Sequence, residues 1–134
     1  MLLSSVKKNI EKNMEQSFKM PDNEKLSEKV YEALIWVATQ CVPSELVRDT
    51  VAEADEEVLR FLPGMKFVVV PERPDFESTT KHLMIDETLV FAVINFTCFM
   101  LSGEGKFKTM SDMWISSYKM NDLRGLLGEE IEND

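Results

Sequence analysis

Histidine and cysteine are scarce in this chain of 134 residues, which contains one histidine, His82, and two cysteines, Cys41 and Cys98. Structural zinc sites draw mainly on these two residue types, so this set is too small and too dispersed to build one. Glycine is scarce as well, and Gly103 and Gly105 lack the strand-to-helix setting of a phosphate-binding loop. We therefore expect no metal site and no cofactor.

Long apolar runs and an excess of basic residues are also missing. The longest apolar stretch, residues 89–101, is interrupted only by Asn95 and Thr97 and falls short of the ~20 residues that span a membrane. The first residues lack the apolar segment of a signal peptide, so we expect a cytoplasmic protein with reduced thiols. The net charge is −9, whereas binding to a phosphate backbone requires a basic surface. We expect neither a membrane nor a nucleic acid as partner.

No group of residues predicts catalysis. His82 is the natural acid–base candidate, and it lies near Asp86 and Glu87 in the sequence. No nucleophile has a defined place beside it, because Cys98 falls within an apolar segment where burial makes a thiol unreactive. We therefore expect a protein that is not an enzyme.

The most prominent segment that is present, residues 86–101, predicts a buried central helix. An apolar run of this length is long for a strand, and a helix that is apolar on all sides must be covered on all sides. Asp86 is a suitable N-cap, Glu87 suits the positive end of the helix dipole, and Gly103 is a suitable stop. The rest of the chain is expected to pack around this helix.

Two helices are predicted ahead of it. Residues 1–20 form an amphipathic pattern whose apolar stripe either packs on the domain or serves as a dimerisation arm. The stripe consists of Leu3, Val6, Ile10, Met14 and Phe18. A second, mostly buried helix follows a cap at Asp22 or Asn23. Its stripe consists of Leu26, Val30, Ala33, Leu34, Val37 and Cys41.

A third helix is predicted from Ser44 to the break at Pro63 and Gly64. Its apolar side would carry Val47, Val51, Ala54, Val58 and Phe61. Residues 44–57 contain six acidic side chains and one basic side chain, Arg48, most of them on the opposite side of this helix. Such a face is either a solvated surface or a binding surface for a basic partner.

The second half of the chain adds strands and a closing helix. Residues 66–70 predict a strand buried on both faces, residues 79–85 an antiparallel partner, and residues 106–108 an exposed edge strand. A closing helix capped by Ser111 has one side made of Met113, Trp114, Ser117, Met120, Arg124 and Leu127.

The expected fold class is α+β, a mainly α-helical single domain with a small two- or three-stranded antiparallel sheet and a buried central helix at about residues 86–101. The expected organisation is an N-terminal helix at 1–20, a globular domain at 21–128 and an acidic tail at 129–134. Gly125 and Gly128 are expected to weaken the end of the closing helix.

The charge distribution gives the leading hypothesis for function. Residues 1–20 carry a net charge of +2 and the other 114 residues carry −11. We expect a cytosolic protein-binding or inhibitor module of the immunity, antitoxin or anti-defence type, which uses its acidic helix face against a basic protein. The partner-binding residues would be Glu45, Asp49, Glu53, Glu56 and Glu57.

Two alternatives remain open. The first is a small-ligand-binding domain with an apolar pocket between the central helix and the sheet, rich in methionine and aromatic residues. Its lining would be Trp36, Asn95, Met100, Met113 and Trp114. The second is a homodimer of unknown role that forms through the N-terminal stripe of Leu3, Val6, Ile10, Met14 and Phe18.

Overall fold

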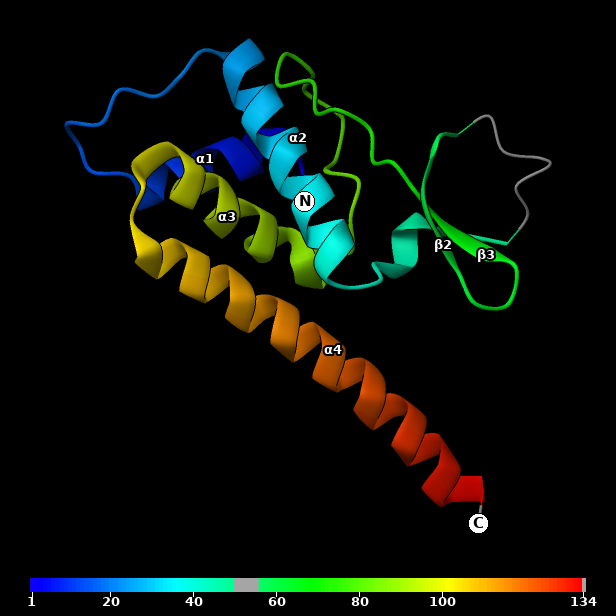
Figure 1. Ribbon diagram of the computed structural model, residues 1–134. Helices are drawn as coiled ribbons and strands as arrows, with labels where there is room; N and C mark the ends of the chain where they lie inside the picture. Colours follow the sequence, from blue (N-terminus) through cyan, green and yellow to red (C-terminus); the bar gives the residue numbers. More distant parts are fainter. Residues whose placement is uncertain (50–55, 134) are drawn as a thin grey trace.

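The computed structural model describes residues 1–49 and 56–133, with the side chains of the last helix described up to Asn121. In chain order the elements are α1 (Leu3–Asn13), α2 (Asn23–Gln40), η1 (Ser44–Leu46), β1 (Val47–Arg48), β2 (Val58–Leu62), β3 (Lys66–Val69), η3 (Glu87–Leu89), α3 (Val90–Ser102) and α4 (Gly105–Asn133), where η marks a 3₁₀ helix. Helices predominate, and the strands form one small antiparallel sheet (Figure 1). The predicted fold class, a mainly helical α+β domain, is confirmed.

Helix α3 lies between the other helices and packs against α1, α2 and α4 (Figure 1). Seven of its 13 residues are buried, Val90, Val93 and Ile94 among them, and the other six are half-buried. Gly103 ends α3 in the left-handed conformation, with φ at 74°, which glycine adopts without strain. The predicted central helix is therefore confirmed, although its first turn, η3, is a 3₁₀ helix.

The apolar stripe of α1 faces the interior of its own chain. Leu3, Val6 and Ile10 are buried in the core, where α1 packs on α3. Met14 and Phe18 lie beyond the end of the helix and are half-buried. These contacts favour packing on the domain over a dimerisation arm, because the buried part of the stripe is not accessible to a second chain.

Helix α2 begins at the predicted cap, where the carboxylate of Asp22 accepts a hydrogen bond from the backbone N–H of Lys25 at 2.9 Å. Leu26, Val30 and Leu34 lie on its buried side, as the apolar spacing predicts. Cys41 follows the last turn and is also buried. The helix therefore has its predicted place in the core.

The predicted third helix at residues 44–62 is wrong. The chain instead forms η1 and β1 at the start of this range and β2 at its end. The valine and phenylalanine residues in β2 favour strands, and pairing with β3 outweighs their helical spacing. Val51 and Ala54 lie outside the described residues.

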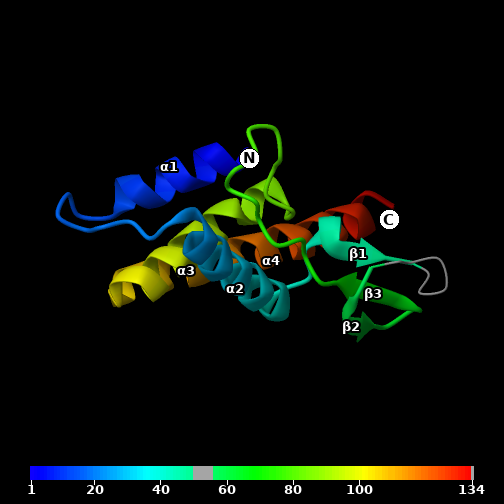
Figure 2. The ribbon, with the colours of Figure 1, turned by 90° about the horizontal axis from the view of Figure 1, so that it is seen from above.

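The sheet has the order β1–β3–β2 and lies at one end of the helical layer, beyond the end of α2 (Figure 2). The strand predicted at residues 66–70 is confirmed as β3, in which Phe67, Val68 and Val69 are buried. The strand predicted at residues 79–85 is wrong, since both edges of β3 are taken by β1 and β2. Its one pairing with the rest of the described chain is a single bridge between His82 and Leu2.

Helix α4 begins at Gly105 rather than at Ser111 and includes residues 106–108, so the predicted edge strand there is wrong. The side that faces the body consists of Phe107, Ser111, Ile115 and Tyr118. The backbone stays helical through Gly125 and Gly128 to Asn133, and the last turns lie away from the other elements (Figure 1). Within the described residues, no helix combines the length and the apolarity needed to cross a bilayer.

Candidate functional site

The hairpin of β2 and β3 exposes two large apolar side chains. Phe61 lies opposite Phe67 in the strand register, yet Phe67 is buried and Phe61 is 71% exposed. Met65, in the turn that joins the strands, is 89% exposed. Phe61 is on β2, an outer strand of the sheet, and the described part of the chain leaves it uncovered.

The turn of this hairpin holds Met65 in an unfavourable backbone conformation. Leu62 pairs with Lys66, so the turn consists of Pro63, Gly64 and Met65. Gly64 and Met65 both have positive φ, at 79° and 62°. Glycine tolerates this region, whereas an L-residue with a side chain pays about 1–2 kcal/mol. Backbone strain of this kind is found at functional sites more often than elsewhere, so Met65 is a candidate binding residue.

Arg60 anchors the hairpin to the end of α2. Its Nη2 atom donates to the backbone carbonyls of Ala38 at 3.2 Å and Cys41 at 2.8 Å. The last carbonyls of a helix lack partners within the helix, and a cation is favoured at that end of the dipole. Arg60 therefore fixes β2 to the helical body, and the exposed residues of the hairpin project from a firmly held strand.

The predicted acidic helix face is wrong, because the described residues before and after 50–55 form η1, β1 and β2 instead of one helix. Its carboxylates lie instead around the sheet, where Asp49 follows β1 and Glu56 and Glu57 precede β2. Arg48 Nε is 3.0 Å from Glu56 Oε1, and Lys66 Nζ is 3.9 Å from Asp49 Oδ1. The remaining two predicted residues are Glu45, which lies in η1, and Glu53, which lies outside the described residues.

Asp86 is the most heavily bonded side chain in the protein's interior that the structure describes. The residue is 8% exposed. Its carboxylate accepts hydrogen bonds from Ser44 N at 3.1 Å, Ser44 Oγ at 2.6 Å, Glu45 N at 2.9 Å and Tyr118 Oη at 2.8 Å. Burial opposes its ionisation, but these hydrogen bonds outweigh burial and hold the pKa of Asp86 below its usual value. Burial, with the bond to Asp86, raises the pKa of Tyr118 to about 12.

This arrangement is structural. Asp86 was predicted to cap the helix that follows it, but its carboxylate caps η1, 42 residues away in the sequence. Tyr118 joins the same carboxylate from α4, so one side chain holds η1, the start of α3 and α4 together. Ser44 Oγ donates to Asp86 and has no histidine beside it that could activate it.

No known protein family, curated protein or solved structure matches this chain. The functional assignment therefore rests on the chemistry of the chain itself.

His82 does not belong to a catalytic arrangement in the described residues. Its side chain is exposed, and no hydrogen bond joins it to a carboxylate or hydroxyl there. It lines a small open hollow of ≈ 180 Å³ together with residues of the 72–84 segment. Burial raises the pKa of Cys98 to about 11, which keeps this thiol unreactive at neutral pH. Among all described residues, no group of three histidine, cysteine or acidic side chains could hold a metal ion.

The predicted pocket residues are not brought together around a cavity. Trp36 stacks on Phe96 with ring centroids 4.0 Å apart, and Trp114 stacks on Phe91 at 5.4 Å. Asn95 donates to the backbone carbonyl of Phe91 at 2.7 Å. The other two predicted residues differ, since Met100 packs against the core and Met113 is exposed. The described hollows are lined by other residues.

Sequence reasoning missed the exposed hairpin. Its signal is Pro63 and Gly64, because a proline–glycine pair between apolar residues indicates a turn as well as the end of a helix. The exposure of Phe61 had no local signal, because it depends on where α2 ends relative to the sheet.

Proposed function

We propose that this protein is a non-enzymatic binding module that holds a basic protein partner at the β2–β3 hairpin, in the manner of an immunity, antitoxin or anti-defence inhibitor. The observation that carries the proposal is Met65, a strained and almost fully exposed methionine on the same hairpin as the exposed Phe61. Neither side chain contributes burial to the fold, so the conformational cost at Met65 brings no gain in stability that the structure describes.

Two exposed apolar side chains on one hairpin suit the centre of a protein interface. Aromatic residues and methionine are enriched at such centres, where a partner covers them and excludes water. A shifted register between Val58 and Arg60 makes the outer strand β2 irregular, which disfavours pairing with a foreign strand. The proposed contact is therefore made by the side chains of Phe61 and Met65.

The charge around the hairpin favours a basic partner. Residues 44–66 contain six acidic side chains against three basic ones, and the whole chain has a net charge of −9. The three basic side chains, Arg48, Arg60 and Lys66, are all engaged by groups of this chain. An acidic rim around an apolar centre attracts a partner with lysine and arginine around an apolar patch. Cys98 is a buried free thiol, which supports action in the reducing cytosol.

Affinity capture with the immobilised chain from its native host tests this proposal. A basic protein should be retained at low salt and released at high salt, because salt screens exposed charges. The double substitution Phe61→Ser with Met65→Asn should weaken retention about tenfold or more, as expected for residues at an interface centre.

A matched pair of charge variants locates the contact. Glu56→Gln with Glu57→Gln should weaken retention, whereas Glu24→Gln with Glu28→Gln, which removes the same charge from the exposed side of α2, should not. Equal effects of both pairs would show that only net charge matters and would contradict a site at the hairpin. Retention that is insensitive to salt would contradict a basic partner.

A further inference from the structure

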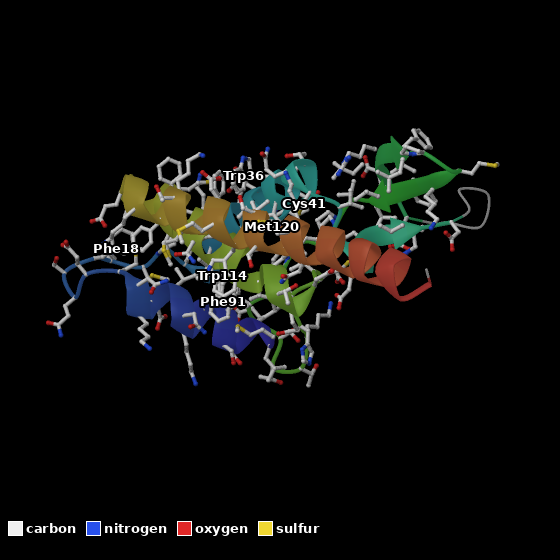
Figure 3. The ribbon with its side chains drawn as sticks, turned by 90° about the horizontal axis from the view of Figure 1, so that it is seen from below. Phe18, Trp36, Cys41, Phe91, Trp114 and Met120 are labelled. Atoms are coloured by element: carbon white, nitrogen blue, oxygen red, sulfur yellow. The ribbon has the colours of Figure 1, made fainter. Side chains whose placement is uncertain are left out.

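Helix α4 has a second apolar side that this chain does not cover. Phe107, Ile115 and Tyr118 face the body, whereas the side pointing to solvent carries large exposed apolar residues. We call these residues the α4 stripe: Met110, Met113, Trp114 and Met120. Met113 is 60% exposed and Met120 is 52% exposed. Figure 3, seen from below, shows α4 crossing the front of the molecule, with Met120 on it and Trp114 beside Phe91.

Helix α4 extends well beyond the elements that it packs against in the described part of the chain (Figure 1). Its 29 residues extend for about 44 Å at 1.5 Å per residue. In the described part of the chain α4 packs mainly on α3 and η3, and its last turns lie away from both (Figure 1). A helix without tertiary contacts is marginally stable in water, so this length indicates a further packing partner.

The charges along α4 are arranged against its own dipole. Residues 105–121 contain three lysines and one aspartate, a net charge of +2, whereas residues 122–133 contain four acids and one arginine, a net charge of −3. The first turn has no acidic residue and the last turn has no basic residue. Each end therefore carries charge of the sign that the helix dipole disfavours.

A second copy of α4 in antiparallel orientation would cover the exposed apolar side and compensate the unfavourable charges at both ends. It places the basic half of each helix beside the acidic half of the other, and it opposes the two dipoles. Met113 and Met120 are seven residues apart, the repeat that keeps a side chain on the seam between two helices packed at a small angle. In the sequence the same step leads on to Leu127.

We propose that two copies of this chain form an antiparallel dimer through the α4 stripe, with a two-fold axis near Met120. A two-fold interface uses the same surface on both chains and closes, so the assembly stops at two. This inference is independent of the proposed function, because the stripe contains no residue of the hairpin.

Light scattering on a size-exclusion column tests the dimer. The native chain should have twice the monomer mass of 15.4 kDa, and Met113→Ser with Met120→Ser should reduce it to 15.4 kDa. Both side chains are exposed, so the far-ultraviolet circular dichroism of the folded domain should persist. Met65→Ser, which removes an even more exposed methionine from the hairpin, should leave the mass doubled. A native chain of 15.4 kDa at the highest soluble concentration would overturn the proposal.

Cysteine cross-linking tests the orientation. In an antiparallel pair only residues near the two-fold axis meet their own copy, so Met120→Cys should form a disulfide-linked dimer on mild oxidation. Met113→Cys should not, because the helix rise separates its two copies by about 21 Å along the seam. Efficient cross-linking at both positions indicates a parallel pair and would overturn the antiparallel arrangement. Cross-linking at Met113 alone would overturn the placement of the axis.

Discussion

At the scale of single residues, the clearest signs of function are side chains placed where they do not help the fold. Met65 has a φ of 62° and an almost fully exposed side chain. Asp86 is the opposite case, a carboxylate whose hydrogen bonds to Ser44, Glu45 and Tyr118 are all explained by structure. The same search for unusual residues thus separates a candidate contact from a structural one.

Replacing Met65 by asparagine should stabilise the protein. Asparagine enters the left-handed region at low cost, so Met65→Asn should raise the free energy of unfolding by about 0.5–1 kcal/mol. Urea denaturation measures the change. The same chemical substitution at Met113, in the middle of α4, should lower the free energy of unfolding by about 0.5 kcal/mol, because asparagine is a poorer helix former. A loss of stability in Met65→Asn would show that the strain at this position has another origin.

Asp86 should make the free energy of unfolding depend on pH in the acid range. The folded protein lowers the pKa of Asp86 below its ordinary value of 3.8, so the unfolded chain takes up its proton first as the pH falls. The stabilisation is therefore fully present well above pH 3.8 and is lost as the pH falls through the folded pKa.

Asp86→Asn should lower the free energy of unfolding at neutral pH by about 1–3 kcal/mol, since an amide leaves converging donors unsatisfied. This difference from the native chain should shrink below pH 3.8. Urea denaturation across this range gives both quantities. Asp22→Asn is the control, because asparagine caps a helix as well as aspartate does. An unchanged difference at low pH would contradict the assigned role of the charge.

At the scale of elements, the sequence predicted the helices whose caps and apolar stripes are local in the sequence. Helix α3 was predictable because it is apolar on all sides and ends at Gly103, whose left-handed conformation strongly favours glycine. Helix α2 was predictable because Asp22 caps an apolar stripe of helical period. In both cases the residues that define the element lie within a few turns of each other.

The small sheet was predictable only in part, because strand pairing is a non-local interaction. The sequence of β3 identified it as a buried strand, but its partners β1 and β2 lie in a range whose apolar spacing also fits a helix. The acidic residues could be identified from the sequence by their charge. The sequence could not show that Asp49, Glu56 and Glu57 lie beside the sheet. The exposed Phe61 could not be predicted either, since its buried neighbour Phe67 is the same residue type.

Helix α4 shows the same limit. The sequence placed Met113 and Met120 on one side of a closing helix, which is correct. It could not show that this side faces solvent, because Phe107, Ile115 and Tyr118 define an equally apolar side that the body covers. In the described part of the chain only one of these two apolar sides is covered.

At the scale of the whole molecule, the hairpin and the α4 stripe are separate surfaces on different elements. A dimer through α4 leaves both copies of the hairpin outside the paired stripes, so the assembly has two proposed partner sites. Two linked sites bind a multivalent partner more tightly than one site does, without any new contact.

Dimerisation also links stability to concentration. A partner that binds only the folded chain shifts unfolding by mass action, so the melting temperature of a dimer rises with protein concentration. Each tenfold increase in concentration should add about 1.4 kcal/mol per dimer to the apparent free energy of unfolding in the native chain. Differential scanning calorimetry over a dilution series measures this. Met113→Ser with Met120→Ser should melt at one temperature throughout the series, and the hairpin variant Met65→Asn should retain the native slope. A melting temperature of the native chain that does not change with concentration would show that it unfolds as a monomer. This result would contradict the proposed α4 dimer.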